Sequence, residues 1–226
     1  MSSELSISRV LRPRNAAKTT YNRYGFLYDL IGGQFERSYA LTGLGMLNIQ
    51  PGEQVLEVGF GTGHALVALA KAVGDHGKVV GIDISERMCA MSWRRINRSG
   101  LSNRVSLYCG DAIKLPFNDD EFDAIFMSFT LELFDTPDIS RVLTELKRVL
   151  KPKGRLCVVS LSKSQREPCI ERLYEWVHRH FPDWVDCRPI NPIRALSRVK
   201  FTILQAKLQP MFGLNVAMVL ASELDK

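Results

Sequence analysis

The sequence predicts an α/β fold in which helices cover both faces of a doubly wound, mostly parallel seven-stranded sheet. Apolar runs of strand length alternate with helical patterns between residues 54 and 161, as in successive strand–helix–strand units. Two later apolar runs, 201–208 and 216–221, are joined by a short link containing Pro210 and Gly213, which indicates a C-terminal antiparallel hairpin. The length of 226 residues suits one main domain with an extension.

The composition is that of an ordinary globular protein, with 46% apolar and 24% charged residues. The five cysteines are odd in number and form no C-x-x-C pair, so we expect neither a disulfide framework nor a metal site. Apolar runs stay shorter than the roughly 18 residues that a membrane helix needs, and the N-terminus shows no leader pattern. These features favour a cytoplasmic protein.

The positive charge is concentrated late in the chain. Residues 1–150 carry 17 Lys plus Arg and 17 Asp plus Glu, whereas residues 151–200 carry 11 and 5. The basic segment 151–200 is either a solvated face or a surface that attracts an anionic substrate or membrane headgroups, with Arg172, Arg179 and Arg188 as its candidate contacts.

The N-terminal segment precedes the sheet. Residues 21–47 have aromatic and aliphatic side chains at mostly helical spacings, interrupted at Gly32–Gly33. We therefore predict a helical cap over residues 1–50, followed by the main domain over 51–226. Residues 164–199 read as an insertion within that domain.

The first two strand–helix units begin at Gln54. An apolar run ends in the glycine cluster 59–63, and residues 65–73 then form a helix. A second strand over 78–84 is followed by Ser85, an expected N-cap, and by Glu86, which favours the positive end of a helix.

Three more strands complete the parallel part. Residues 105–109 and 122–129 are the third and fourth strands. Thr136 is the expected N-cap of a helix that has Pro137 in its first turn and runs to Leu150. Pro152 and Gly154 should then break this helix before a fifth strand over 155–161.

A glycine-rich turn follows the first strand. Gly59, Gly61 and Gly63 stand where a strand passes into a helix, a place where glycines let the backbone approach a ligand. Their spacing is G-x-G-x-G, and His64 occupies the position at which a dinucleotide-binding turn has its third glycine. A nicotinamide oxidoreductase is therefore disfavoured, while a plain strand-to-helix turn remains an alternative.

Acidic residues end the second and third strands. Asp83 lies 20 residues beyond Gly63, where its carboxylate can bind both hydroxyls of a ribose. A turn residue is the alternative reading, although Ser85 is the better-placed cap. Asp111, after the third strand, can accept a hydrogen bond from an adenine amino group.

Together these motifs resemble class I S-adenosylmethionine-dependent methyltransferases, which have a Rossmann-like sheet. The resemblance covers about residues 21–161 and rests on segments 57–63, 81–85, 109–112 and 115–124. It implies S-adenosylmethionine as the cofactor and S-adenosylhomocysteine as the product. The residues that it assigns to the cofactor are Glu57, Gly59, Gly61 and Gly63 around the methionine part, Asp83 at the ribose, Ile84, Met88, Asp111 and Ala112 around the adenine, and Ser128 beside the sulfonium.

Methyl transfer asks the protein mainly for alignment, since the carbon is already activated by positive sulfur. No particular catalytic residue is therefore required, and a general base is optional. The candidates for the acceptor pocket are Tyr21, Tyr24, Tyr28, Phe129 and Glu132.

The acceptor is less defined than the cofactor. Residues 24–29 resemble the ubiquinone and menaquinone C-methyltransferases and the phospholipid N-methyltransferases, and 159–163 with 173–175 resemble the quinone group. Residues 184–200 depart from that pattern. We expect a small amphiphilic acceptor of quinone or lipid type, with possible membrane contact through 151–200. A soluble metabolite and a non-catalytic cofactor-binding protein are the alternatives.

Nucleic acid is not an expected partner. Residues 128–131 lack the Pro-Pro-aromatic segment of amino-directed nucleic-acid methyltransferases, and no recognition motif is evident. The sequence makes no prediction of the oligomeric state.

Overall fold

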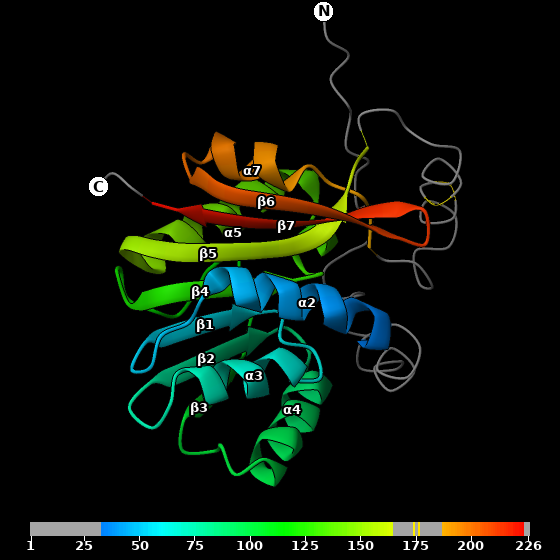
Figure 1. Cartoon of the computed structure of the whole chain (residues 1–226). Helices are drawn as coiled ribbons and strands as arrows, with labels where there is room; N and C mark the ends of the chain where they lie inside the picture. Colours follow the sequence, from blue (N-terminus) through cyan, green and yellow to red (C-terminus); the bar gives the residue numbers. More distant parts are fainter. Residues whose placement is uncertain (1–32, 165–173, 175, 177–186, 224–226) are drawn as a thin grey trace, which may run out of the picture.

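The computed structural model describes residues 33–164, 174, 176 and 187–223 (Figure 1). Seven strands form one sheet in the order β3-β2-β1-β4-β5-β7-β6. The five strands from β3 to β5 pair in parallel, while β7 is antiparallel to both β5 and β6. The predicted fold class and C-terminal hairpin are confirmed. The strands are β1 (Gln54–Val58), β2 (Lys78–Asp83), β3 (Val105–Cys109), β4 (Phe122–Ser128), β5 (Leu150–Ser162), β6 (Thr202–Met211) and β7 (Leu214–Ser222).

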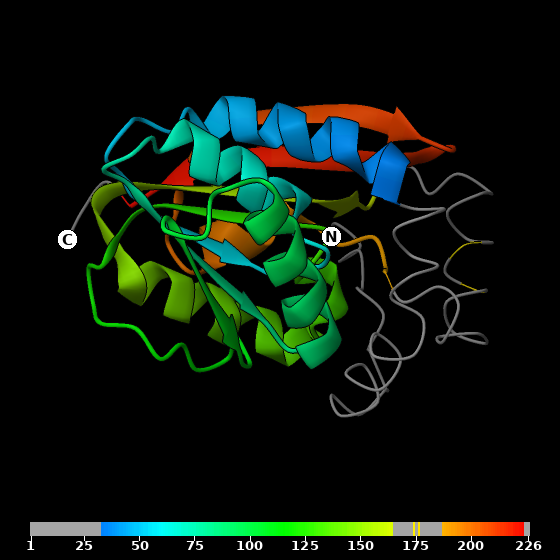
Figure 2. The same ribbon diagram turned by 90° about the horizontal axis from the view of Figure 1, so that it is seen from below.

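Helices cover both faces of the sheet, as Figures 1 and 2 show. One face packs against α2 (Gly33–Leu47), α3 (His64–Ala72) and α4 (Glu86–Arg98). The other face packs against α5 (Thr136–Val149) and α7 (Pro192–Arg198), and the short 3-10 helix η1 (Leu131–Leu133) follows β4. Each helix turns an apolar stripe toward the sheet, so two hydrophobic layers sandwich it.

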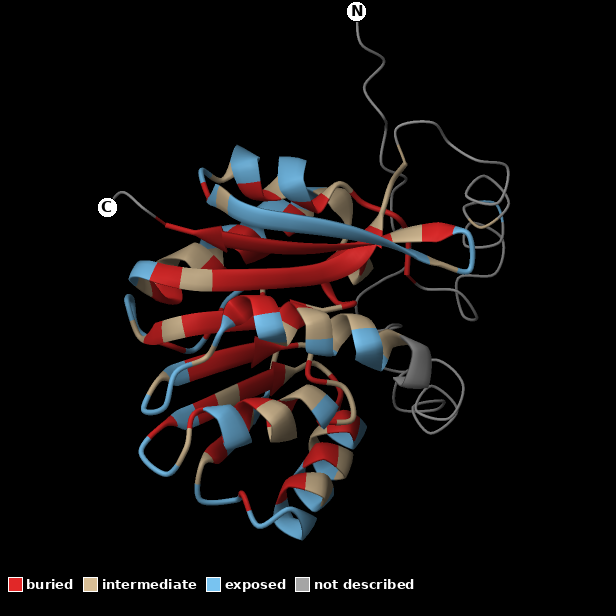
Figure 3. Ribbon diagram, viewed as in Figure 1, coloured by how far each residue is buried: buried red, intermediate tan, exposed pale blue. Residues whose placement is uncertain are grey.

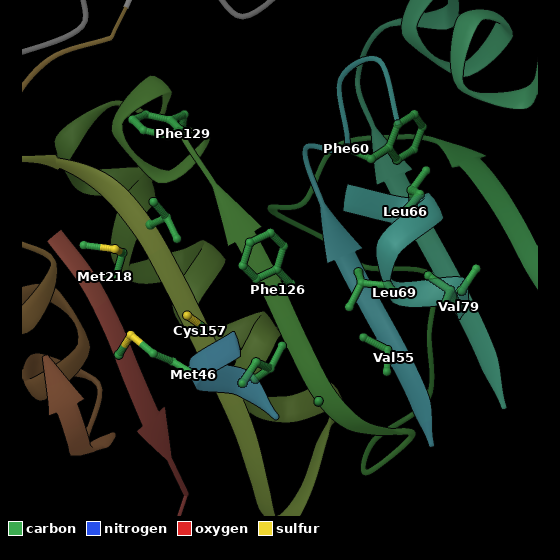
Figure 4. Close-up of a cluster of buried hydrophobic side chains, with 14 of the residues drawn as sticks. Met46, Val55, Phe60, Leu66, Leu69, Val79, Phe126, Phe129, Cys157 and Met218 are labelled. Carbon is green, nitrogen blue, oxygen red and sulfur yellow. The ribbon is translucent and has the colours of Figure 1, made fainter. Parts of the chain in front are cut away.

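The central strands are buried on both faces because both layers reach them. In β4, Ala124 and Phe126 face the α2–α3–α4 layer, whereas Ile125 and Met127 face the α5–α7 layer. Figure 4 shows Phe126 in the first of these layers, with Phe60 and Phe129 at the ends of β1 and β4. Burial declines toward β6, an edge strand that is exposed along most of its length (Figure 3).

Two predicted boundaries are wrong. The N-cap of α5 is Asp135, not Thr136, because the Asp135 carboxylate accepts a hydrogen bond from the Thr136 backbone N–H at 2.8 Å. The fifth strand begins at Leu150 and not at residue 155, so Pro152 and Gly154 lie within β5, and α5 has already ended at Val149. A shift in register between Phe122 and Ala124 absorbs this irregular start.

The end of the predicted insertion pairs with the last residue of β5. Ile190 forms a parallel bridge with Ser162, and α7 begins immediately afterwards. Asn191 caps α7 by accepting a hydrogen bond from the Arg194 N–H, and Pro192 fills its first turn. The Asn-Pro pair is a helix-start signal that could have predicted α7. Residues 1–32 of the predicted cap lie outside the described residues.

None of the helices in the described part of the chain is long and apolar enough to cross a membrane.

Candidate functional site

The predicted site residues gather at the carboxyl ends of the central strands. The strand order reverses at β1, since β2 lies on one side of it and β4 on the other. At such a reversal, the connections leave toward opposite faces and open a crevice in which α/β folds bind ligands. The loops that follow β1, β2, β3 and β4 all begin at this edge of the sheet (Figure 1).

The glycine loop needs glycine for two different reasons. All three glycines have positive φ, of 71° at Gly59, 50° at Gly61 and 81° at Gly63, a conformation that other residues adopt at a cost. A Cβ on Gly59 would stand 2.2 Å from Thr130 Oγ1, and one on Gly63 would stand 2.7 Å from Ser92 Oγ. At Gly61 a Cβ would meet no described atom within 4 Å. Gly59 and Gly63 therefore permit close packing, whereas Gly61 faces open space.

Side chains from distant elements hold this loop in place. Asp83 Oδ2 accepts a hydrogen bond from the Gly61 N–H at 2.9 Å, and Ser92 Oγ in α4 donates to the Gly61 carbonyl at 2.8 Å. Thr130 Oγ1 donates to the Ser128 carbonyl at 2.9 Å and reaches the Gly59 carbonyl at 3.3 Å. Sequence reasoning missed Ser92 and Thr130, because neither belongs to a local motif.

Two carboxyl groups lie together beneath the loop. Burial and the nearby charge of Asp83 raise the pKa of Glu57, a residue that is 3% exposed. Burial also raises the pKa of Asp83 to about 6, although hydrogen bonds from the Ser85 and Gly61 N–H groups lower it. Glu57 Oε2 accepts no hydrogen bond within the described residues. The arrangement is costly when both groups are ionised, and a bound cation would relieve it.

The ends of β2 and β3 form the next part of the edge. Ser85 caps α4 as predicted, since its Oγ accepts a hydrogen bond from the Met88 N–H at 3.3 Å. Met88 is buried and Ile84 is half-buried. Asp111 Oδ1 accepts a hydrogen bond from the Ile113 N–H at 3.0 Å, which fixes the turn that contains buried Ala112.

The end of β4 carries two acceptor-pocket candidates. Phe129, at φ 49°, is buried in a left-handed conformation that is unusual for a bulky residue, and its N–H donates to the Val159 carbonyl. Ser128 precedes it and is half-buried. Glu132 is fully buried and its Oε1 accepts a hydrogen bond from the Leu161 N–H at 3.0 Å, so this carboxylate braces the end of β5. The candidates Tyr21, Tyr24 and Tyr28 lie outside the described residues.

Several cations of the basic segment 151–200 belong to the fold. Arg188 has no exposed surface, and its Nη2 donates to the Phe134 carbonyl at 2.6 Å. The expectation that Arg188 contacts membrane headgroups is therefore wrong. Lys151 and Arg155 form ion pairs with Asp123 and Glu53, both with N–O distances of 2.8 Å. Arg172 and Arg179 lie outside the described residues.

Comparison with known proteins identifies related chains. A family profile described as a methyltransferase domain matches residues 55–154. The chain is 33% identical over 168 residues to a demethylmenaquinone methyltransferase of Shouchella clausii, covering 74% of this chain and 69% of that one.

A demethylmenaquinone methyltransferase of Bacillus cereus is 37% identical over 144 residues, which is 64% of this chain. The match spans only 59% of that relative's length. A solved structure of a SAM-dependent methyltransferase from Aquifex aeolicus superposes with a TM-score of 0.59 at 27% identity, covering 81% of this chain and 88% of that one.

Proposed function

Because the chain belongs to the S-adenosylmethionine-dependent methyltransferase family, we propose that it transfers the methyl group of this cofactor to a quinone-type acceptor. The relatives whose names specify demethylmenaquinone support this choice of acceptor. The observation that carries the proposal is the pair of carboxyl groups, Glu57 and Asp83, beneath an open glycine loop.

The pair suits the charge of the cofactor. S-adenosylmethionine has an ammonium group and a sulfonium, and a cation near two buried carboxylates favours their ionised forms. Glu57 would accept a hydrogen bond from the ammonium, and Asp83 would accept bonds from the ribose hydroxyls while it holds Gly61. The open side of Gly61 leaves room for a ligand against the loop.

The adenine would lie between two walls. Ile84 and Met88 would contact its faces, and Asp111 with the Ala112 N–H would bind its edge. Asp111 is already oriented by its bond from the Ile113 N–H, so little side-chain freedom would be lost on binding.

The residues at the end of β4 would face the reacting groups. When bound, the cofactor supplies a methyl carbon that is activated by a positive sulfur. Ser128 and Phe129 would line the place where that carbon meets the acceptor. The chain's contribution is a fixed line of approach, which can contribute about 7–11 kcal/mol to lowering the barrier. Thr130 and Glu132 support it by bracing the glycine loop and β5.

A reduced quinone suits this mode of catalysis. Its hydroxyl groups enrich the ring carbon with electrons, and the carbon gains a methyl group while a ring proton leaves to a base or water. Membrane contact is a separate part of the proposal, because a quinone with an isoprenoid tail resides in the bilayer. Arg172 and Arg179 remain its candidate contacts, and loss of binding to anionic vesicles in an Arg172→Gln, Arg179→Gln variant would test it.

The first experiment measures binding and transfer separately. The purified chain is titrated with S-adenosylmethionine and with NADH in a calorimeter, and is then incubated with methyl-labelled cofactor and a demethylated, prenylated hydroquinone. We expect binding of the former alone and label in the quinone fraction. The Asp83→Asn variant is measured in parallel, and we expect it to bind S-adenosylmethionine more weakly than the wild-type chain and to transfer less label.

Each other outcome has a distinct meaning. Cofactor binding with label only in a tail-free phenol would replace the lipid acceptor by a soluble metabolite. Cofactor binding without any transfer would favour a non-catalytic cofactor-binding protein. Absence of cofactor binding would overturn the proposal.

A further inference from the structure

Two cysteines meet at the rim of the adenine side of the site. Cys89 lies in the first turns of α4, and Cys109 is the last residue of β3. Cys109 is the neighbour of Asp83 in the register between β3 and β2. The two thiols therefore lie beside Asp83, which ends β2, and beside Ile84, which follows it.

The contacts of the two thiols are reciprocal. The Cys89 Sγ is 3.8 Å from the carbonyl oxygen of Tyr108, the residue before Cys109. The Cys109 Sγ is 3.6 Å from the carbonyl oxygen of Ile84, just before α4 begins. The Cys109 thiol also lies close enough to Cys89 to contribute to the raised pKa of Cys89. Helix α4 and strand β3 are thus already held together at the point where a covalent link would form.

We propose that Cys89 and Cys109 form a reversible disulfide that closes the adenine side of the cofactor site. The oxidant is a hydroperoxide. The inference rests on the proposed function only for its effect on the cofactor, since disulfide formation depends only on the two thiols and the oxidant.

The exposure of the two residues sets the order of events. Cys109 is exposed, so it meets the oxidant first, whereas Cys89 is only partly exposed. The Cys109 thiolate attacks the peroxide, the O–O bond breaks, and a sulfenic acid and hydroxide or alkoxide are formed. Cys89 then attacks the Cys109 sulfur, the S–O bond breaks, and its thiol proton leaves with the hydroxyl group as water. Two thiols are oxidised to one disulfide and one peroxide is reduced.

The electrostatics favour this sequence. Burial and the nearby Cys109 raise the pKa of Cys89 to about 12, so in the reduced protein Cys89 is a protonated thiol. Conversion of Cys109 to a neutral sulfenic acid removes one cause that disfavours the Cys89 thiolate, while burial, the larger cause, remains. Attack by Cys89 is therefore easier after its partner has been oxidised than before.

The disulfide would change the cofactor site because its two anchors flank the adenine-binding residues. Met88 precedes Cys89, and Gly110 and Asp111 follow Cys109. A disulfide requires Cα atoms about 4.4–6.8 Å apart, which limits how far the start of α4 and the end of β3 can separate. If the adenine enters between the start of α4 and the end of β3, the disulfide would restrict the opening that admits it.

Peptide mapping tests the link itself. The reduced protein is treated with a few equivalents of hydrogen peroxide and digested with trypsin without reduction. We expect peptide 88–94 to be linked to peptide 105–114, with a loss of two hydrogen atoms that a phosphine reductant reverses. Cys157 is an internal control, because it is fully buried and should stay unmodified. In Cys89→Ser the link should be absent and Cys109 should be trapped by dimedone as sulfenic acid.

Calorimetry tests the consequence. Binding of S-adenosylmethionine to the oxidised protein should be weaker than to the reduced protein by at least about fivefold, and re-reduction should restore it. Cys89→Ser should show a smaller change after peroxide treatment.

Two results would overturn the inference. Absence of the linked peptides, with Cys109 present as sulfenic acid in the wild-type chain, would show that the thiols do not join. Linked peptides with unchanged cofactor affinity would show that the disulfide does not act on the site. Failure of the reduced protein to bind S-adenosylmethionine would instead count against the proposed function.

Discussion

At the residue scale, Asp83 combines two tasks. Its carboxylate accepts hydrogen bonds from the Gly61 and Ser85 N–H groups, each at 2.9 Å, and so connects the glycine loop to the start of α4. Each oxygen retains acceptor capacity for a ribose hydroxyl. A change at this position is therefore expected to affect the loop as well as the ligand.

Replacing Asp83 tests both tasks. Asp83→Ala should weaken binding of S-adenosylmethionine by about 1.5–3 kcal/mol, because at least one hydrogen bond to a charged acceptor is lost. Asp83→Asn keeps one acceptor oxygen and should lose less. Calorimetric titration measures the affinity, and thermal unfolding shows whether the loop is also weakened. Unchanged affinity in Asp83→Ala would remove Asp83 from the site.

The raised pKa of Asp83 predicts an opposite pH dependence for stability and for binding. Because this carboxyl group is protonated more readily in the folded protein, its contribution to the free energy of unfolding is present at low pH. That contribution is lost as the pH rises from 3.8, the ordinary value, to about 6. A cationic cofactor needs the ionised form, so its affinity should rise over the same range.

Calorimetry at pH 5, 6 and 7.5 and constant ionic strength measures this effect. The affinity should fall by up to about tenfold per pH unit below 6. Asp83→Asn should show a smaller slope, with the remainder due to Glu57, whose pKa is also raised. A flat profile for the wild-type chain would contradict the prediction.

The residues that contact the loop from afar mark the limit of sequence reasoning. Gly59, Gly61, Gly63 and Asp83 follow a pattern that can be recognised locally. Thr130 and Ser92 reach the loop only after the chain has folded, from 71 and 31 residues away respectively. A threonine after a strand and a serine in a helix carry no signal of such contacts.

At the element scale, the glycines of the loop serve different purposes: Gly59 and Gly63 are needed for packing, whereas we expect Gly61 to be needed for binding. Gly61→Ala should lower the stability by about 1–2 kcal/mol, because a residue with a Cβ is strained at φ 50°. The added methyl group projects into open space, so we expect it to weaken cofactor binding by more than about tenfold, or 1.4 kcal/mol.

Gly100→Ala is the matched control. Gly100 also has a positive φ, of 67°, and an added methyl group would meet no described atom within 4 Å, but the residue lies after α4, away from the loop. The variant should lose similar stability and keep its affinity. Equal affinity in both variants would exclude Gly61 from the binding surface.

Helix boundaries show why element ends are hard to predict. At α5 two consecutive residues, Asp135 and Thr136, can both cap a helix, and the sequence alone does not rank them. At β5 the breaking residues Pro152 and Gly154 lie in an irregular strand start, where the pairing partner tolerates them. Tertiary pairing therefore overrides a correct local preference.

At the scale of the whole molecule, α2 joins the two parts of the sheet. It packs against β4, β5 and β7, and Tyr39 donates a hydrogen bond to the Pro210 carbonyl on β6 at 2.7 Å. At the other end, Arg155 Nε donates to the Leu47 carbonyl at 3.0 Å. The helix thus links the parallel strands to the antiparallel hairpin.

Two glycines in α2 provide a stability test of this packing. A Cβ on Gly43 would stand 2.5 Å from Val159 Cγ2, so Gly43→Ala should destabilise the fold by about 1–3 kcal/mol. Gly45 has no described atom within 4 Å, and Gly45→Ala should stabilise the helix by about 0.5–1 kcal/mol. Chemical denaturation measures both. Destabilisation by both substitutions would mean that α2 is not packed as described.

The overall architecture was the most predictable level. Alternating strand and helix patterns establish a parallel sheet, and the two apolar runs near the C-terminus establish the hairpin. Charge was less informative: the basic segment 151–200 includes Arg188, which is buried, and Lys151 and Arg155, which are paired with acids. A count of charges cannot distinguish cations that stabilise a fold from those that meet a partner.

The contact between Thr130 and the glycine loop has a consequence for synthesis on the ribosome. β1 is made long before β4, its neighbour in the sheet, and Thr130 follows Gly59 by 71 residues. At about 5–20 residues per second, synthesis of these residues takes roughly 4–14 seconds, during which the loop lacks its hydrogen bond from Thr130. Under the proposed function, we therefore expect cofactor binding to stabilise the growing chain only after β4 has emerged and paired with β1.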